Sequence, residues 1–364
     1  MWTPPSPASA SVIWLCCCLT GKQGASAMQI TTIGLDLAKN VFQVHGIDQE
    51  GKVGVRRSLR RSEVVEYFAK PPPCLVGIEA CATAHHWARE IGRFGHTVRL
   101  MPPAYVKPYV KRNKNDIADA EAICEAVTRP NMRFVAVKTA AQQSVLMLHR
   151  CRVLLVRQRT MLANAIRAHL AEFGIAMPQG IRTLLTALNV PKNEMNNLPD
   201  LVRIALTPMT ASLIELGQRI KALEIEIARE HRGNETSRRL ETIPGFGVIT
   251  STAMAATVAD PTAFKSGREF AAWLGLTPRE SSSGGKQRLG SIQDGRRVSS
   301  NVARCRSDGG DPLRSRGRVR QDGVIRKLME KKPAKVVAVA LANKMARIAW
   351  ALMTRGEIYR AIPA

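Results

Sequence analysis

Short apolar runs alternate with polar segments through the first third of the chain. A β-rich run over residues 28–36 stops at Asp36, and two more strands are predicted around the turn at residues 49–51. Further apolar runs at 74–79 and 96–101 have helical patterns before, between and after them. Three strands joined by hairpins, followed by strands that alternate with helices, predict a mixed sheet flanked by helices.

Helical spacing dominates the middle of the chain. From about residue 139 to 173 apolar residues recur at helical intervals, and in a second stretch they are separated by three and four residues alternately, the seam of a coiled coil. The two sets are Val145, Leu148, Leu155, Leu162 and Ile166, then Leu213, Leu216, Ile220, Leu223 and Ile227. This pattern predicts either an arm between two domains that also contacts a second subunit, or a helical hairpin within one chain.

A compact, mainly helical C-terminal unit is predicted from about Arg238. Its sequence IPGFGVITSTAMAA contains a turn with Gly245 and Gly247 between a short helix and an alanine-rich one, which resembles a helix-hairpin-helix. The glycine N–H groups could bind a phosphate without reading base sequence. Alternatively, the two glycines only permit a tight turn.

Charge points to a polyanionic partner. The 364 residues, enough for two domains, include 54 Lys and Arg against 29 Asp and Glu, for a formal net charge of +25. Each phosphate that a cation neutralises releases counterions and strengthens binding, so nucleic acid is the first candidate. The alternative is a basic surface that serves only solubility.

Cysteine usage and hydropathy bear on the compartment. The eight cysteines form no Cys-x-x-Cys pair and are predicted to be reduced, which favours the cytoplasm. We expect no membrane span, since no apolar run approaches the ~20 residues required. Residues 1–27 have no basic region before their apolar core, so they make a poor signal peptide; we interpret them as a non-native or disordered extension before a natural start at Met28.

Four acidic residues suit a magnesium site. Asp36 and Glu79 end two predicted strands, and Asp116 and Asp119 are three residues apart on a later helix. Hard divalent cations prefer oxygen ligands and keep waters or phosphate oxygens in the remaining positions. A cation bound by these acidic residues would offset the repulsion between Asp116 and Asp119. Nearby, Lys111, Arg112 and Lys114 could approach the phosphates.

A second candidate site lies in the segment GLTPRESSSGGKQRLG. Three serines, among them Ser282 and Ser283, precede two glycines, and the cations Arg279, Lys286 and Arg288 lie nearby. This pattern places a hydroxyl on a flexible loop in a positive field, where a serine could attack phosphorus. The alternative is an ordinary flexible linker.

Six motifs together resemble a known family. They are TTIGLDLAKNVFQVHG, VGIEACATAHHWAR, KRNKNDIADAEAI, IPGFGVITSTAMAA, FAAWLGLTPRESSSGGKQRLG and KVVAVALANKMARIAWALMTRGE. In this order they resemble the transposases of the insertion sequence 110 family, in particular its 1111 subgroup. The resemblance runs from Met28 to about Gly290 and resumes near Val324.

The resemblance implies a fold and a mechanism. An α/β N-terminal domain with a ribonuclease H-like (RuvC-like) fold is expected over 28–138, a helical coiled-coil region over 139–235 and a C-terminal transposase domain over 236–364. The four acidic residues would bind Mg²⁺, and Ser283, with Ser282 as the other registration, would form a covalent phosphoserine intermediate with DNA. A structured guide RNA and a homo-oligomer, a dimer or tetramer that joins the two sites across subunits, are also implied, in the cytoplasm of a bacterium and at the nucleoid when active.

The segment 291–321 departs from the family pattern. It holds eight arginines and lacks the expected amphipathic helices, a composition typical of a disordered charged segment. Compensating frameshifts in the gene would explain it, and they would leave this copy damaged; a loop that merely adds nucleic-acid affinity is the alternative. Two other functions therefore stay open: a nuclease of the RuvC or ribonuclease H type that uses metal-activated water, and an inactive nucleic-acid-binding remnant.

Overall fold

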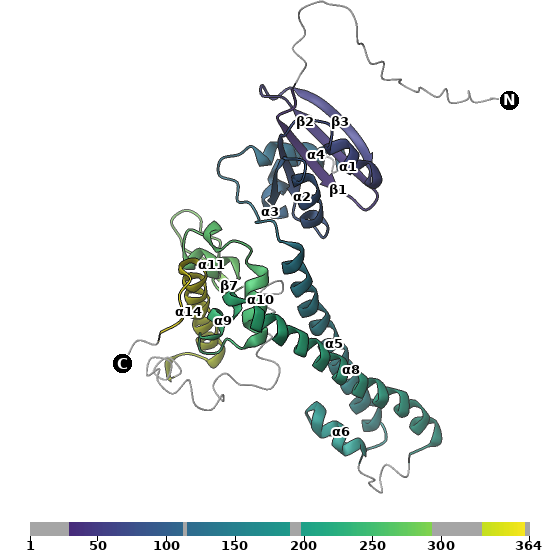
Figure 1. Ribbon diagram of the computed structural model, residues 1–364. Helices are drawn as coiled ribbons and strands as arrows, with labels where there is room; N and C mark the ends of the chain where they lie inside the picture. The colour runs from purple at the N-terminus through teal and green to yellow at the C-terminus, as the bar shows by residue number, and fades with distance from the viewer. Residues whose placement is uncertain (1–28, 112–114, 190–197, 293–329, 361–364) are drawn as a thin grey trace, which may run out of the picture. The chain divides into compact units, whose positions relative to one another are not determined.

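The chain folds into two compact units. The computed structural model describes residues 29–111, 115–189, 198–292 and 330–360 (Figure 1). The first unit contains the chain up to Ala84 and Glu90–Arg133, and the second contains His85–Arg89 and the chain from Phe134 onward. The predictions for the extension 1–27 and for most of the segment 291–321 concern residues outside these ranges.

A five-stranded mixed sheet forms the centre of the first unit, as the apolar pattern predicted. Its strands lie in the order β3-β2-β1-β4-β5. Strand β2 is antiparallel to its neighbours β1 and β3, whereas β1, β4 and β5 are parallel. The bounds are Thr32–Leu37 for β1, Val41–Ile47 for β2, Val53–Arg60 for β3, Leu75–Glu79 for β4 and Thr97–Met101 for β5. The carboxyl ends of β1 and β4 therefore meet at one edge.

Helices join and cover these strands. The α-helices are α1 (Val64–Phe68), α2 (Ala84–Gly92), which has residues in both units, α3 (Pro103–Val106) and α4 (Asp116–Val127). Side chains of β1 alternate between the two faces of the sheet, and Ile33 and Leu35 are almost fully buried on the face opposite Gly34. Helix α4 packs on β1, β2 and β4, with Ile123 fully buried.

Two long helices of the second unit pair within one chain. Helices α5 (Ala140–Ala171) and α8 (Asp200–Gly233) lie side by side, with the shorter α6 (Ile181–Asn189) beside them (Figure 1). Ile166 and Leu170 of α5 share an apolar cluster with Leu206 and Leu213 of α8, whereas Arg152 pairs with Glu224 at 2.7 Å, so the helices run antiparallel. The structure thus contains a helical hairpin within one chain, and the contact with a second subunit stays a prediction.

The C-terminal part of the second unit is mainly helical. It comprises α9 (Glu235–Glu241), α10 (Val248–Thr257), α11 (Gly267–Trp273), a two-stranded hairpin of β6 (Pro278–Glu280) and β7 (Leu289–Ile292), and α14 (Ala334–Arg355). One apolar cluster joins Leu240 of α9, Met254 of α10, Phe270 of α11 and Ala349 of α14. Residues far apart in sequence thus share one core.

Helix α14 is mostly apolar. Residues Val336–Arg355 are long and apolar enough to cross a membrane by length and composition alone. Lys344 and Arg347 interrupt its apolar run. Ala346, Ala349 and Leu352 of this helix pack in the shared core, as in the core helix of a globular domain.

The cysteines of the described residues are free thiols. Cys74, Cys81, Cys124 and Cys151 make no disulfide. Burial raises the pKa of Cys124 to about 12 and that of Cys74 to about 11. Both thiols are therefore protonated and inert at neutral pH.

Candidate active site

Two of the predicted carboxylates lie at the ends of neighbouring parallel strands. Asp36 is near the end of β1 and Glu79 is the last residue of β4. The register pairs Leu35 with Ile78, so Asp36 and Glu79 are the next residues at the same edge of the sheet. Both side chains are partly buried.

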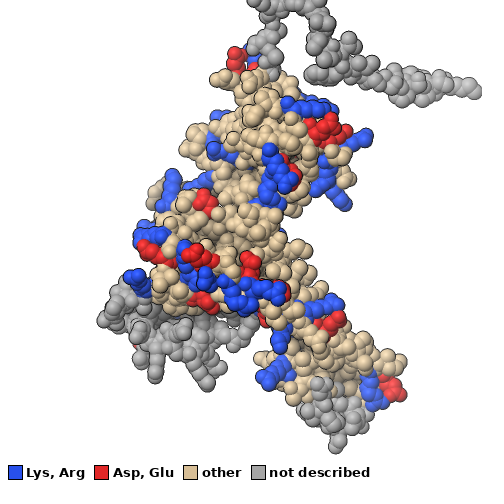
Figure 2. Space-filling model, viewed as in Figure 1, with Lys and Arg blue, Asp and Glu red and all other residues tan. Residues whose placement is uncertain are grey.

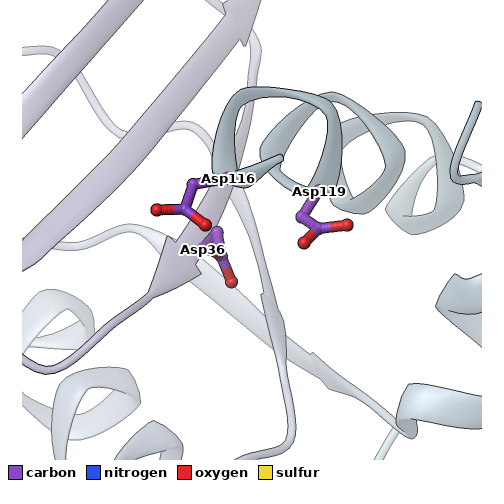
Figure 3. A group of neighbouring side chains, drawn as sticks. All are labelled: Asp36, Asp116 and Asp119. Carbon is purple, nitrogen blue, oxygen red and sulfur yellow. The ribbon is translucent and has the colours of Figure 1, made fainter. Parts of the chain in front are cut away.

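The other two carboxylates occupy the first turn of α4. This helix begins where Asn115 caps it, since the Asn115 side-chain oxygen accepts a hydrogen bond from the Ala118 amide at 2.7 Å. One carboxylate oxygen each from Asp36, Asp116 and Asp119 lie within 4.8 Å of one another (Figure 3). The helix N-terminus partly compensates this concentration of negative charge.

Glu79 is not one of these three closely grouped carboxylates. Its charge nevertheless acts on Asp36, because it is one of the groups that raise the pKa of that residue. The structure therefore brings three of the four predicted acidic residues into one group and places the fourth on the adjacent strand.

Asp36 has a strongly altered acidity. Burial is the largest cause, followed by repulsion from Asp119, Asp116 and Glu79, and together they raise the pKa of Asp36 to about 6. A divalent cation would remove this repulsion and supply the opposite charge that the carboxylates lack. Oxygen-only donors at this spacing fit a hard cation such as Mg²⁺.

Two glycines that the sequence analysis did not single out allow α4 to approach the sheet. Gly34 and Gly77 are paired in register on β1 and β4. A Cβ atom on Gly34 would lie 2.2 Å from the Ala120 carbonyl oxygen, and one on Gly77 would lie 2.8 Å from the Val127 Cβ. Because Asp36 is two residues beyond Gly34, this close packing sets the distance between Asp36 and the acidic residues of α4. A glycine inside each of two buried apolar runs was the signal in the sequence.

Of the three basic residues predicted to approach phosphates before α4, the structure describes Lys111. Lys111 is exposed and donates a hydrogen bond to the Glu121 carboxylate at 2.6 Å, an interaction that raises the pKa of Lys111. Arg56 approaches the same carboxylate at 4.0 Å. Arg112 and Lys114 lie outside the described residues. Lys111 thus has an acidic partner in the chain itself.

The serine-rich segment is a hairpin, although a flexible loop was expected. Gly284 and Gly285 both have positive φ, 56° and 72°, and form a two-residue turn between Ser283 and Lys286. The backbone of Ser283 exchanges hydrogen bonds with that of Lys286, at 3.4 and 3.1 Å. Consecutive glycines between two short extended runs were the signal that the sequence interpretation missed.

Ser282 and Ser283 differ in their environment. The Ser282 hydroxyl donates to the Glu280 carboxylate at 2.9 Å and accepts from the Arg288 amide at 3.2 Å, so it is part of the hairpin. Ser283 is exposed beside the turn. Lys286 is exposed at the same turn, while the side chain of Arg279 is outside the described part.

The two glycines of the turn between α9 and α10 differ: position 245 requires a glycine, whereas position 247 has room for a side chain. Gly245 has a φ of 87°, and a Cβ there would lie 2.9 Å from the Met345 Cε, so the fold itself requires this glycine. Gly247 is the N-cap of α10 with a φ of −94°, and a Cβ there would meet nothing within 4 Å. Backbone conformation thus accounts for a glycine at position 245 but not at position 247.

Comparison with known proteins identifies the family. A model of DEDD-type transposases of IS110 matches residues 33–175, and a model described as "Transposase IS116/IS110/IS902 family" matches residues 237–300. The first match contains the carboxylate group and the second contains Ser283.

Relatives match along nearly the whole chain. A "Probable family 20 transposase" of Pseudomonas aeruginosa is 46% identical over 347 residues, which cover 92% of this chain and 99% of the relative. The transposase for insertion sequence element IS1328 of Yersinia enterocolitica is 39% identical, covering 91% of this chain and 98% of the relative. The transposase for IS1111A of Coxiella burnetii is 37% identical, with coverages of 93% and 94%.

These matches define the class of protein as a transposase, an enzyme that acts on DNA. The chain belongs to the IS110 family of transposases, as its motifs indicated.

Proposed function

We propose that this chain cuts and rejoins DNA with Ser283 as nucleophile and with Asp36, Glu79, Asp116 and Asp119 as ligands of Mg²⁺. The observation that carries the proposal is the approach of three carboxylates to within 4.8 Å at the carboxyl edge of the sheet. The high pKa of Asp36, which burial and its acidic neighbours cause, supports a site completed by a cation. We assign the sheet-bearing residues 28–138 to a RuvC-like domain on the same basis.

The carboxylates would hold the cation, and the chain positions them in advance. When bound, Mg²⁺ polarises a phosphate and stabilises charge on the entering and leaving oxygens. Asn115 fixes the start of α4, while Gly34 and Gly77 fix its distance from β1. The protein thereby orients three ligands before any substrate binds.

Ser283 supplies the nucleophile. Its hydroxyl oxygen forms a bond to a DNA phosphorus while the bond from phosphorus to one strand end breaks. The hydroxyl proton passes to water, and the departing DNA oxygen gains a proton. In the rejoining step a DNA hydroxyl attacks the phosphoserine, which releases Ser283 with its proton restored. Lys286, Arg279 and Arg288 contribute positive charge around this phosphate.

The partners follow from family and charge. Donor and target DNA are the substrates, a structured guide RNA pairs with both, and a homo-oligomer joins the carboxylate site of one subunit to Ser283 of another, in the bacterial cytoplasm. Lys and Arg side chains are distributed over the visible surface of each unit (Figure 2), which suits extended contact with nucleic-acid backbones. The turn of Gly245 and Gly247, which we assign to a helix-hairpin-helix, would contact a phosphate through its N–H groups.

Reconstitution tests the proposal. The full chain is incubated with RNA from the element's flanking end, donor DNA and target DNA in Mg²⁺, and recombinant junctions are sequenced. We expect junctions and a protein–DNA adduct that both disappear in Ser283→Ala. Cleavage that persists without an adduct in Ser283→Ala would instead identify a nuclease that uses water.

A second candidate function is a catalytically inactive nucleic-acid-binding remnant, which the composition of residues 291–321 favours. It predicts tight, salt-sensitive binding of DNA with no cleavage in Mg²⁺. Replacing 291–321 with the corresponding segment of the IS1328 transposase would then restore junction formation.

A further inference from the structure

A row of polar side chains continues from Asp36 across the sheet. Asp36 is paired in register with Gln43 of β2, and Gln43 is paired with Ser58 of β3. Residues directly opposite one another on neighbouring strands share a face of the sheet. Gln43 and Ser58 therefore lie on the same face as Asp36.

Helix α4 covers this face of the sheet at the preceding pair of residues, Gly34 and His45. Two residues before Asp36, a Cβ on Gly34 would collide with α4, and His45, which is paired with Gly34, is buried. The row of Asp36, Gln43 and Ser58 differs, because Gln43 is only partly buried and Ser58 is exposed. The accessible part of the face thus begins at the carboxylate group and extends to the edge strand β3.

Hydrogen bonding leaves the Gln43 amide group with donors to spare. The Ser58 hydroxyl donates a hydrogen bond to the Gln43 Oε1 at 3.0 Å. Among the described residues, this is the one hydrogen bond that the Gln43 side chain makes. With the carbonyl oxygen engaged, the NH₂ group is the end that can bind a ligand, and it carries two donors. A phosphate or sugar oxygen is an acceptor that matches them.

A cation follows on the same strand. Arg60 is exposed and is two residues beyond Ser58, so it lies on the same face of β3, whereas Arg57 lies on the opposite face, with its guanidinium 5.9 Å from the centre of the Tyr67 ring. From Asp36 to Ser58 the row crosses two strand spacings, about 10 Å. That length matches roughly three steps of a nucleic-acid strand at about 3.4 Å each.

We propose that Gln43, Ser58 and Arg60 form a backbone-binding strip that positions the nucleic-acid strand whose phosphate lies at the carboxylate group. Gln43 donates to a backbone oxygen next to that phosphate, Ser58 holds the Gln43 amide in place, and Arg60 neutralises a phosphate further along. The inference rests on the proposed function in taking nucleic acid as the ligand and in placing one of its phosphates at the carboxylate group.

Binding measurements test the strip without requiring turnover. The probe is a fluorescein-labelled 30-base-pair DNA duplex titrated with the full chain in Ca²⁺, followed by fluorescence anisotropy at several salt concentrations. Arg60→Ala should weaken binding. It should also make the negative slope of log affinity against log salt shallower by about 0.9, the value for one lost phosphate contact. Gln43→Ala should weaken binding about tenfold with an unchanged slope, since a neutral donor releases no counterion.

Arg57→Ala is the matched control, because it removes the same side chain from the same strand on the other face. It should bind as the unaltered chain does, and thermal unfolding should verify that each variant is folded. Wild-type binding by folded Gln43→Ala and Arg60→Ala variants would overturn the strip, as would an equal loss in Arg57→Ala. Failure of the proposed transposition would instead appear as absent junctions, whatever the outcome of these titrations.

Discussion

Asp36 is a residue whose ionisation should affect the stability of the first unit. Its folded pKa of about 6 lies above its ordinary value of 3.8, so the folded state binds a proton that the unfolded state has already released between these two values. Stability should therefore fall as pH rises through this window. A cation should reverse the trend, because it favours the ionised carboxylate.

Thermal unfolding in EDTA tests this pH dependence. We expect the melting temperature to fall between pH 4.5 and 7, less steeply in Asp36→Asn, which cannot ionise. Adding Mg²⁺ at pH 7 should raise the melting temperature of the unaltered chain more than that of the variant. A steeper fall in Asp36→Asn would contradict the assignment of the effect to this side chain.

The two candidate serines should respond differently to substitution. Ser283→Ala should abolish the covalent DNA adduct, because it removes the attacking oxygen. Ser282→Ala should retain the adduct at a reduced rate, since it removes hydrogen bonds to Glu280 and Arg288 that hold the hairpin. Adduct formation is followed by denaturing electrophoresis with labelled DNA; an adduct lost only in Ser282→Ala would reverse the two roles.

At the scale of elements, the contact between α4 and the sheet determines the site. Gly34→Ala would place a methyl group against the backbone of α4, which cannot yield as a side chain can. Overpacking of this kind costs about 1–3 kcal/mol or more and should push Asp116 and Asp119 away from Asp36. We expect a lower melting temperature together with weaker Mg²⁺ binding by calorimetry.

Gly46→Ala is the control for this prediction. It adds the same methyl group to the neighbouring strand, where the nearest atom is the Ile30 Cγ2 at 3.1 Å, and a side chain can move. Its stability should change less and its Mg²⁺ binding should be unaffected. Equal effects of the two substitutions on Mg²⁺ binding would show that the spacing of α4 is unimportant.

The helical hairpin offers a second test at this scale. Arg152 pairs with Glu224 across α5 and α8 with only 13% of its side chain exposed, whereas Arg219 pairs with Glu215 within α8 with 61% exposed. Arg152→Ala should destabilise the chain by about 1–3 kcal/mol, since it leaves a polar partner partly buried. Arg219→Ala should cost less than about 1 kcal/mol in urea unfolding. The reverse order would argue against α5 and α8 pairing in solution.

Periodicity made the elements predictable, but not all of their contacts. Strand ends at Asp36 and Glu79 could be located because apolar runs stop there, and parallel strands bring their ends to one edge. The choice between a subunit contact and a helical hairpin could not be made, because both use the same apolar spacing. The role of Gly34 was missed, since a close approach depends on a helix 86 residues later, at Ala120.

At the scale of the whole molecule, the formal charge of +25 and the family relationship point to the same partner. The sequence indicated DNA through charge and motifs, and the structure adds a group of three carboxylates that could hold a cation. Affinity and chemistry should therefore be separable: salt should weaken DNA binding by the whole surface, whereas loss of the carboxylates should stop the reaction while binding persists.

Titration calorimetry of Mg²⁺ into the full chain tests the central claim most directly. The account predicts a binding event that is lost in Asp36→Asn and in Asp119→Asn and is retained in Asp48→Asn, whose side chain caps the turn after β2 at the other edge of the sheet. Equal Mg²⁺ binding by all four proteins, or none by the unaltered chain, would contradict it.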